Sequence, residues 1–466
     1  MPTERLWRAA AITLCAAVPV SFYVIGDVTD AFPGVLTVAD EEKGPASGPR
    51  ARGEDYDRVT ASVPIPSVAP EVPDAQAQDL QARMDAHAAL PVVDGNLSYA
   101  VVDAGTGEQV AGRDAHTVHV PASTLKLLTA AAVLRQYTGT EVLTTRAAVQ
   151  DGTVTLQGGG DMTLSEDELR ELADSAAELA REQGATSVTV ALDTGFLTGG
   201  ANPAWGNNGT AGGWVTPTAS IAVDRGWLDG TQYGPKSTDP AGDAAHLFAT
   251  MLTEAGLEVQ GEVSAGTAPE GAPSVQVESE PIVDIVRHTL LISDNTTAEL
   301  LAHLVALQRG EETTPQGAAA AVEAEIRELG VELGLPQQDL DALQILDGSG
   351  LSRDNRVPPA LLAAVMGQVA SGEVAGLEQI LFDVPVAGLS GTLADRFDAA
   401  GTQDARGIVR GKTGYLGGAA TLAGVAVLPG GRTVGYSIVV HGFEGASALE
   451  ARAAVDAVAA ELVQED

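Results

Sequence analysis

The sequence predicts an α+β fold in which the two ends of the chain build one antiparallel sheet covered by helices. Near the N-terminal end, the stretch "NLSYAVVDAGTGEQVAG" carries two β-prone runs around a glycine-containing turn, which is typical of a β-hairpin. Three strand-like runs lie near the C-terminal end: "ARGIVRGKTG", "AATLAGVAVL" and "RTVGYSIVVHG". Helical patterns at residues 75–90 and 447–463 flank these strands. A hairpin and a meander of this kind combine into one sheet with helices packed on it.

Strongly helical sequence fills much of the chain between the two ends. Helices are predicted over residues 123–137, 281–307, 315–334 and 358–372. Residues 142–233 differ in texture: they contain an amphipathic helix pattern near 165–183, the strand-like run "SVTVAL" and the run "GGANPAWGNNGTAGGW". We therefore expect a main domain of residues 75–141 and 234–466, with a small α/β subdomain inserted as residues 142–233.

The first 74 residues have the features of an export signal followed by a tether. Arg5 and Arg8 precede an apolar run over residues 9–25, and acidic residues follow it, as in a segment that leads a chain across a membrane. Residues 1–37 are therefore predicted as a signal anchor or signal peptide, and the missing small-x-small cleavage site favours the anchor. Residues 38–74, rich in proline and charge, are predicted as a disordered linker. The folded part is expected outside the cytoplasm, in the cell envelope.

Composition excludes several classes of function. Lys+Arg 26 against Asp+Glu 63 gives a net charge of −37, which repels nucleic acid and anionic lipid. The single cysteine, Cys15, excludes an internal disulfide framework and a cysteine-based zinc site. The close pair His116 and His119 has no carboxylate cluster beside it in the sequence, so a strand or loop role is predicted. We expect no metal and no cofactor.

The stretch "VPASTLKLLTAAAVL" places Ser123 and Lys126 three residues apart at the start of a helical run. Only four lysines occur in the chain, so most positive charge comes from arginine. Residues at i and i+3 share one face of a helix, which lets the lysine amine reach the serine hydroxyl. A buried lysine can lose its proton and act as a base, whereas an arginine cannot. Ser123 and Lys126 are thus a candidate nucleophile and base.

Two further motifs lie in the order that this chemistry needs. "LLISDNTTAELLAHLVA" places Ser293, Asp294 and Asn295 at the break between two helical runs, where the simplest interpretation is a helix N-cap. "VRGKTGYLGG" places Lys412, Thr413 and Gly414 at the end of a strand. Either motif alone is weak, but the combination of S-x-x-K, S-D-N and K-T-G has a chance frequency well below about one in a thousand.

With these motifs the sequence resembles the penicillin-recognising serine acyltransferases. Four finer matches resemble the low-molecular-mass class C penicillin-binding proteins, which are D-alanyl-D-alanine carboxypeptidase/endopeptidases: "GGGDMTL", "DGSGLSRDNRVPP", "PVAGLSGTLADRF" and "KTGYLGGAATLAG". The resemblance covers nearly all of the folded part. It implies a β-lactamase/transpeptidase-like fold, peptidoglycan stem peptides as substrates and β-lactams as covalent inhibitors.

The resemblance also implies roles for individual residues. Ser123 would attack the carbonyl between two D-alanines, with Lys126 as the base. Ser293 would pass a proton to the leaving amine, and Asn295 would hold the substrate amide and orient Lys126. Lys412 would supply positive potential near Ser293.

Substrate-binding roles follow in the same way. Thr413, which Gly414 follows in the K-T-G motif, would bind the terminal carboxylate of the substrate. The backbone N–H groups of Ser123 and Tyr415 would form an oxyanion hole. Asp193 in "LDTGFL" and Arg353 after "GSGLS" would bracket the amine and carboxylate of a diaminopimelate end, which suits a zwitterion. The domain that full-size members carry within the insertion is expected to be missing or vestigial here.

Two other functions were weighed. A class A-like β-lactamase needs a glutamate that activates the deacylating water, and the region around Glu328 and Glu332 offers glutamates without the expected asparagine partner. A catalytically silent wall-binding protein is the alternative from another class. The joint presence of Ser123, Lys126, Ser293 and Lys412 argues against it.

Overall fold

A computed structural model describes residues 74–230 and 234–465 of the chain. The predicted signal segment, residues 1–37, and all of the predicted linker except Asp74 lie outside these described residues, as does Cys15. Within the described part, no helix is both long enough and apolar enough to span a bilayer.

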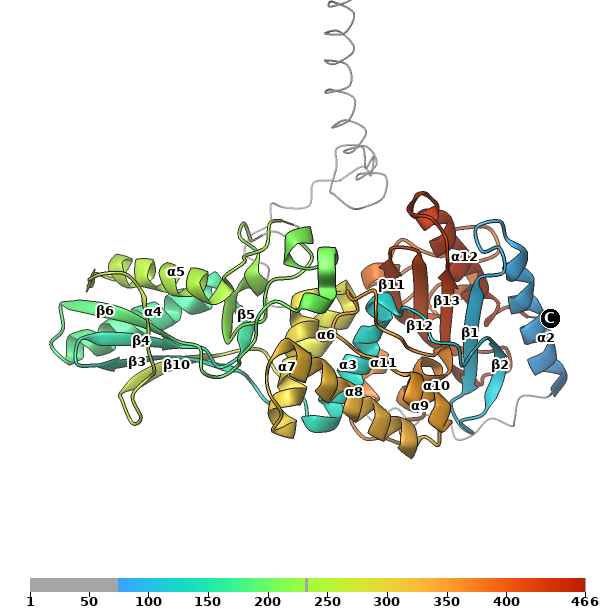
Figure 1. Ribbon diagram of the computed structural model, residues 1–466, viewed down its shortest axis with the longest axis horizontal. Coiled ribbons are helices and arrows are strands. Elements are labelled where there is room, and N and C mark those ends of the chain that lie inside the picture. Colours follow the sequence, from blue (N-terminus) through green and yellow to red (C-terminus); the bar gives the residue numbers. More distant parts are fainter. Residues whose placement is uncertain (1–73, 231–233, 466) are drawn as a thin grey trace, which may run out of the picture. The chain divides into compact units, whose positions relative to one another are not determined.

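The main sheet has five antiparallel strands contributed by both ends of the chain (Figure 1). Their order is β11 (Arg410–Leu416), β12 (Ala419–Val427), β13 (Thr433–His441), β1 (Leu97–Asp103) and β2 (Gln109–Arg113). In β1 and β13, Leu97 pairs with Val440 and Asp103 with Val434. The predicted α+β class, with one sheet built by the two ends, is confirmed.

Helices cover both faces of this sheet. On one face α2 (Asp74–Ala86) packs against β2 and α12 (Ala448–Ala460) packs against β12 and β13, and both helices share a core with Leu97, Tyr99 and Val101 of β1. On the other face α10 (Pro359–Ser371) packs against Ala100 and Val102. Because both faces of β1 are covered, all seven of its residues are buried, rather than every second one.

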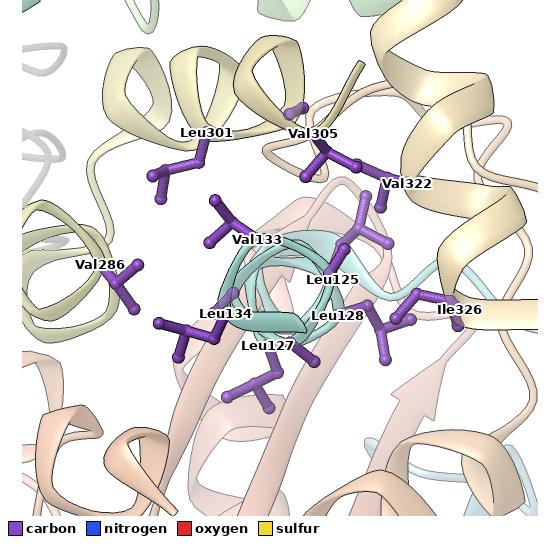
Figure 2. Close-up of a cluster of buried hydrophobic side chains, with 14 of the residues drawn as sticks. Leu125, Leu127, Leu128, Val133, Leu134, Val286, Leu301, Val305, Val322 and Ile326 are labelled. Atoms are coloured by element: carbon purple, nitrogen blue, oxygen red, sulfur yellow. The ribbon is translucent and has the colours of Figure 1, made fainter. Parts of the chain in front are cut away.

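The helical region surrounds α3 (Leu125–Gln136), which begins directly after the short helix η2 (Ala122–Thr124). Every residue of α3 from Leu125 to Leu134 is buried. Figure 2 shows its leucine and valine side chains pointing outward on several sides, towards Val286, Leu301 and Val322 of three other helices. The helices of this region are α6 (Ile282–Ile292), α7 (Asn295–Arg309), α8 (Pro315–Glu332), α9 (Gln337–Ala342) and α11 (Gln379–Asp383). A helix buried on all sides holds its N-terminus in a fixed position.

A second, mixed sheet belongs to the insertion. Its order is β10 (Ser274–Glu278), β3 (Thr144–Gln150), β4 (Thr153–Gln157), β6 (Ser187–Asp193) and β8 (Glu258–Val259), with β9 (Ser264–Ala265) also paired to β6. Helices α4 (Glu166–Glu182) and α5 (Pro240–Glu254) share a core with it. Two short strands, β5 (Asp161–Leu164) and β7 (Ile221–Val223), form a separate parallel pair. The remaining short helices are η1 (His87–Ala89), η3 (Pro203–Asn208), η4 (Thr210–Gly212), η5 (Asp224–Gly226), η6 (Gly391–Leu393), η7 (Gln403–Ala405) and η8 (Gly445–Ser447).

The predicted end of the insertion at residue 233 differs from the structure. Helix α5 and strands β8, β9 and β10 all follow that residue, yet they pack on or pair within the second sheet. Strand β10 returns to pair with β3, at the point where the insertion starts. The second sheet therefore includes residues up to Glu278, beyond the predicted end of the insertion.

Candidate active site

Ser123 lies in η2, immediately before α3, and its backbone is confined by two neighbouring segments. Ala122, the residue before it, has a φ of 47°, which is a strained conformation for a residue with a side chain. A Cβ on Gly350 would collide with the carbonyl of Ala122. A Cβ on Gly414 would lie 3.0 Å from the amide nitrogen of Ser123 and 2.9 Å from the carbonyl oxygen of Pro121. Glycine is needed at both positions so that the Gly350 loop and β11 can approach the Ser123 backbone.

Lys126 lies one turn further along and is fully buried. Its Nζ lies 3.2 Å from Ser123 Oγ, 2.7 Å from Asn295 Oδ1 and 2.6 Å from the carbonyl oxygen of Ser349. Burial lowers the pKa of Lys126 to about 8, although the nearby carboxylates of Asp347, Asp294 and Glu299 act in the opposite direction. A substantial fraction of Lys126 is therefore neutral slightly above neutral pH.

The S-D-N motif forms the predicted break between two helices. Ser293 ends α6 in the left-handed region, with φ 64° and ψ 34°. Asp294 is the N-cap of α7, where its carboxylate accepts a hydrogen bond of 2.9 Å from the Thr297 amide. Asn295 is bonded to Lys126 and donates from Nδ2 to the carbonyl of Trp214 at 3.0 Å. Helix capping thus explains Asp294 but not Asn295, whose side chain is directed to Lys126.

The K-T-G motif lies on β11. Lys412 is fully buried, and its Nζ donates to the carbonyl of Thr413 at 3.0 Å. Thr413 is half-buried and donates from Oγ1 to Thr392 Oγ1 at 2.8 Å. Burial, together with the charges of Lys126 and Arg396, holds the pKa of Lys412 well below its usual range. The charge of Lys126 is thus, after burial, a cause that disfavours the protonated form of Lys412.

Arg353 lies at the other end of β11. A Cβ on Gly417 would be 2.6 Å from Arg353 Cζ, so the guanidinium packs directly on that glycine. Arg353 also lines a cavity of about 510 Å³ together with Arg356, Leu416, Phe443 and the two histidines His119 and His441. The histidine rings are stacked at 4.3 Å, and burial lowers the pKa of each. The positive charge on this cavity wall therefore comes from the two arginines.

Asp193 is placed differently from the sequence-based expectation. It ends β6, is 6% exposed, and its carboxylate accepts hydrogen bonds from the Gly195 amide, Gln157 Nε2 and the Ala268 amide at 3.0, 3.2 and 2.9 Å. All of these donors belong to the inserted subdomain. The carboxylate is thus occupied in its own turn, and these contacts do not bring it together with Arg353.

Several buried residues around Lys126 were missed from the sequence. Glu299, on α7, is 1% exposed and contacts the loop that bonds Lys126. The Asp347 carboxylate accepts from the amides of Gly350 and Ser352 at 2.9 and 2.6 Å and so shapes that loop. A sequence signal existed for Glu299, because it is a lone charge in the apolar run "AELLAHLVA" one turn after Asn295.

The glutamates considered for a β-lactamase lie elsewhere. Glu328 and Glu332 are on α8, with exposed side chains paired to Arg309 and Arg135 at 3.0 and 2.8 Å. They are used in surface ion pairs. Among the described residues, no three His, Cys, Asp or Glu side chains are grouped to hold a metal ion.

The fold and the grouping of S-x-x-K, S-D-N and K-T-G define a serine hydrolase of the penicillin-recognising class. The profile of the D-Ala-D-Ala carboxypeptidase 3 (S13) family matches residues 80–236 and 229–462, and the chain belongs to this family. This match confirms the resemblance to the low-molecular-mass class C penicillin-binding proteins. The enzyme is a serine-type D-Ala-D-Ala carboxypeptidase, a hydrolase of the cell envelope.

Individual relatives agree with this assignment. The chain is 31% identical over 472 residues to carboxypeptidase DacB of Mycolicibacterium smegmatis, covering 98% of both chains. It is 30% identical over 475 residues to a D-alanyl-D-alanine carboxypeptidase of an Actinomadura species, covering 84% of this chain and 85% of that protein. Penicillin binding protein 4 (dacB) of Haemophilus influenzae shares the fold, with a TM-score of 0.65 at 19% identity over 83% of this chain and 99% of that one.

Proposed function

We propose that this enzyme cleaves the bond between the two terminal D-alanines of peptidoglycan stem peptides through an acyl-enzyme on Ser123. The observation that carries the proposal is the position of Lys126 Nζ, buried and 3.2 Å from Ser123 Oγ, with a pKa of about 8. A neutral amine has two N–H groups and one lone pair. Its two shorter contacts, to the Ser349 carbonyl and Asn295 Oδ1, take the two N–H groups, which leaves the lone pair for Ser123.

The reaction follows from this arrangement. Lys126 takes the proton of the Ser123 hydroxyl as Oγ bonds to the carbonyl carbon of the penultimate D-alanine. The backbone N–H groups of Ser123 and Tyr415 stabilise the oxyanion. As the C–N bond breaks, Ser293 passes a proton to the leaving amine, and Lys126 restores the serine's proton. Water then attacks the ester, Ser123 leaves with a proton, and the shortened peptide is released.

Thr413 and Lys412 are proposed to hold the terminal carboxylate of the substrate. A carboxylate arriving beside Lys412 favours the charged form of the lysine and so offsets the repulsion by Lys126. Lys412 can then supply positive charge to the bound substrate. A cross-linked peptide carries a carboxylate beside its leaving amine as well, so the same site accommodates DD-endopeptidase cleavage.

The experiment that tests this function uses the wild-type enzyme with two reactants. A stem pentapeptide should lose one D-alanine per molecule, detected by mass spectrometry. Benzylpenicillin should add its full mass to the protein, with the adduct mapped to Ser123 and persisting while the free drug is removed. Rapid loss of the adduct with hydrolysed penicillin in solution would identify a β-lactamase instead.

Arg353 is proposed to bind the carboxylate of the substrate's side arm, supported by its position on the wall of the cavity beside β11. Its replacement by alanine should lower kcat/KM for a peptide with a free diaminopimelate end by roughly ten- to 150-fold, the loss of one charge-assisted contact. Penicillin acylation should be nearly unchanged, since penicillin lacks that end. Arg170→Ala, on the exposed face of α4, is the matched control. Equal loss of both reactions would make Arg353 structural.

Asp193 stays a less favoured candidate for the amine, because its carboxylate already accepts three hydrogen bonds.

Membrane retention is proposed from the sequence alone. The apolar run over residues 9–25 after Arg5 and Arg8 supports an uncleaved anchor. Full-length protein should then sediment with membranes, and protein lacking residues 1–37 should not. A soluble species that starts near residue 37 would show cleavage.

A further inference from the structure

Glu299 is a buried carboxylate for which the proposed mechanism has no use. It lies on α7, one turn after Asn295, and is 1% exposed. A single oxygen, Oε1, accepts three hydrogen bonds: from the amides of Gly348 and Ser349 at 3.1 and 2.9 Å, and from Trp205 Nε1 at 3.1 Å. These donors come from two loops far apart in the sequence. Glu299 is therefore the point at which both loops are fastened to α7.

The Gly348–Ser349 segment that Glu299 holds is the one that contacts the base. The Ser349 carbonyl accepts the shortest hydrogen bond of Lys126 Nζ, at 2.6 Å. The preceding carbonyl, of Gly348, accepts from Thr129 Oγ1 at 2.7 Å. With its amide nitrogens bound to Glu299, this short stretch of backbone has both its donors and its acceptors engaged. The direction of the Ser349 carbonyl, and hence of the Lys126 lone pair, depends on the Glu299 contact.

Trp205 ties this arrangement to the insertion. It lies in η3, within the loop from Asn202 to Thr216, and is 3% exposed. The same loop bonds the catalytic region through Asn202 and Asn208, which donate to the carbonyls of Leu346 and Leu351 at 2.8 and 3.2 Å. The loop therefore holds the segment that carries Ser349 at both of its ends, through Leu346 and Leu351.

The charge of Glu299 also acts on the base. Burial, then the Asp347 carboxylate, raise the pKa of Glu299 to about 7. Lys126 interacts electrostatically with the carboxylates of Asp347, Asp294 and Glu299, and its charge also acts on Lys412. His303, whose Nδ1 contacts the Glu299 carbonyl at 2.7 Å, is kept neutral because burial lowers its pKa to about 4. The anion of Glu299 thus favours the protonated form of Lys126.

We propose that Glu299 is a positioning residue for the base: it orients Lys126 through the Ser349 carbonyl and sets the pH at which Lys126 can accept the Ser123 proton. This inference rests on the proposed function, in which Lys126 is that base. A residue that only supported the fold would change stability but would leave the pH dependence of acylation where it was.

The test compares Glu299→Gln with wild type, measuring the second-order rate of penicillin acylation from about pH 5.5 to about pH 9.5. Glutamine keeps an oxygen for the three donors and loses the charge. The plateau at high pH should therefore remain within about threefold. The acidic limb should move to lower pH above about pH 7, where Glu299 is ionised in the wild type, because loss of that anion favours neutral Lys126. The rate near pH 7.5 should therefore rise about two- to threefold relative to the plateau.

The matched control is Glu325→Gln. Glu325 is as buried as Glu299 but lies on α8, where it pairs with Arg135 and Arg309 at 2.6 and 2.7 Å. Its substitution should lower stability and leave the acidic limb unmoved. Glu299→Ala, which removes the acceptor itself, should lower the plateau by about 30- to 100-fold if it folds, as judged by circular dichroism.

Two results for the Glu299 variants would overturn the inference. An unmoved limb in Glu299→Gln, or a limb that moves equally in Glu325→Gln, overturns the inference. A folded Glu299→Ala with a plateau within about threefold of wild type also overturns it. If Glu299→Ala does not fold, the glutamine pair alone decides. Failure of the wild-type enzyme to acylate at Ser123 would instead defeat the proposed function.

Discussion

Ser123→Ala is expected to eliminate covalent penicillin labelling and to lower D-alanine release by about 10⁴- to 10⁶-fold, as removal of a nucleophile does in other serine hydrolases. Among the described residues, Ser123 carries the one hydroxyl hydrogen-bonded to Lys126 Nζ. Ser123 follows the strained Ala122 and lies between the Gly350 loop and β11, so its Oγ alone is 3.2 Å from the buried amine of Lys126. Intact mass spectrometry after penicillin treatment, with circular dichroism to verify folding, measures the effect.

Ser264→Ala is the control for this substitution, because Ser264 is an exposed serine of β9 in the inserted sheet. It should label like the wild-type enzyme. A full penicillin adduct on folded Ser123→Ala protein would show that the nucleophile is a different residue, and the proposed mechanism would have to be abandoned.

Lys126→Arg should be almost as inactive as Lys126→Ala, with acylation reduced by about 10³-fold or more in both. An arginine keeps the positive charge, and could keep bonds to Asn295 and the Ser349 carbonyl, but it does not release its proton. The comparison therefore asks whether the site needs a charge or a base. Second-order acylation rates for both variants, at several pH values, give the answer.

Lys236→Arg provides the control for placing a guanidinium in a buried lysine site. Lys236 lies 3.6 Å from the centre of the Trp227 ring and donates to the Arg225 carbonyl at 2.8 Å, and burial lowers its pKa to about 8 as well. It makes no contact with Ser123 in the described structure, so its variant should lose stability and still form the acyl-enzyme. Acylation by Lys126→Arg within about tenfold of wild type would contradict the role of Lys126 as the base.

The main sheet was predictable because its strands have strong local signals. The run "LSYAVVD" in β1 and the strands joined by "PGG" are long and apolar, as buried strands must be. The end of the insertion was not predictable in the same way. Strands β8 and β9 have two residues each and are largely exposed, so they carry no periodicity, and only their pairing with β6 reveals where they belong.

The same contrast holds in the active site. Lys126 and Asn295 were identified by motif spacing, and the structure brings them to 2.7 Å across 169 residues of sequence. Glu299 is different, because its oxygen meets amides of Gly348 and Ser349 that no local pattern relates to α7. Asp193 has the right chemistry for an amine, but the Ala268 amide, distant in sequence, already occupies its carboxylate. Contacts of this kind are decided by tertiary structure.

The pairing of β1 with β13 has a consequence for the order of events during synthesis. Strand β1 is synthesised early, and its partner β13 is the last strand of the described chain, so one edge of β1 stays unpaired while most of the chain follows. The insertion, whose strands are closer in sequence, can fold well before that. Unpaired strand edges of this kind expose an incomplete chain to aggregation. Strand β11, which carries Lys412, is also made late, so the incomplete chain lacks part of its active site and is inactive.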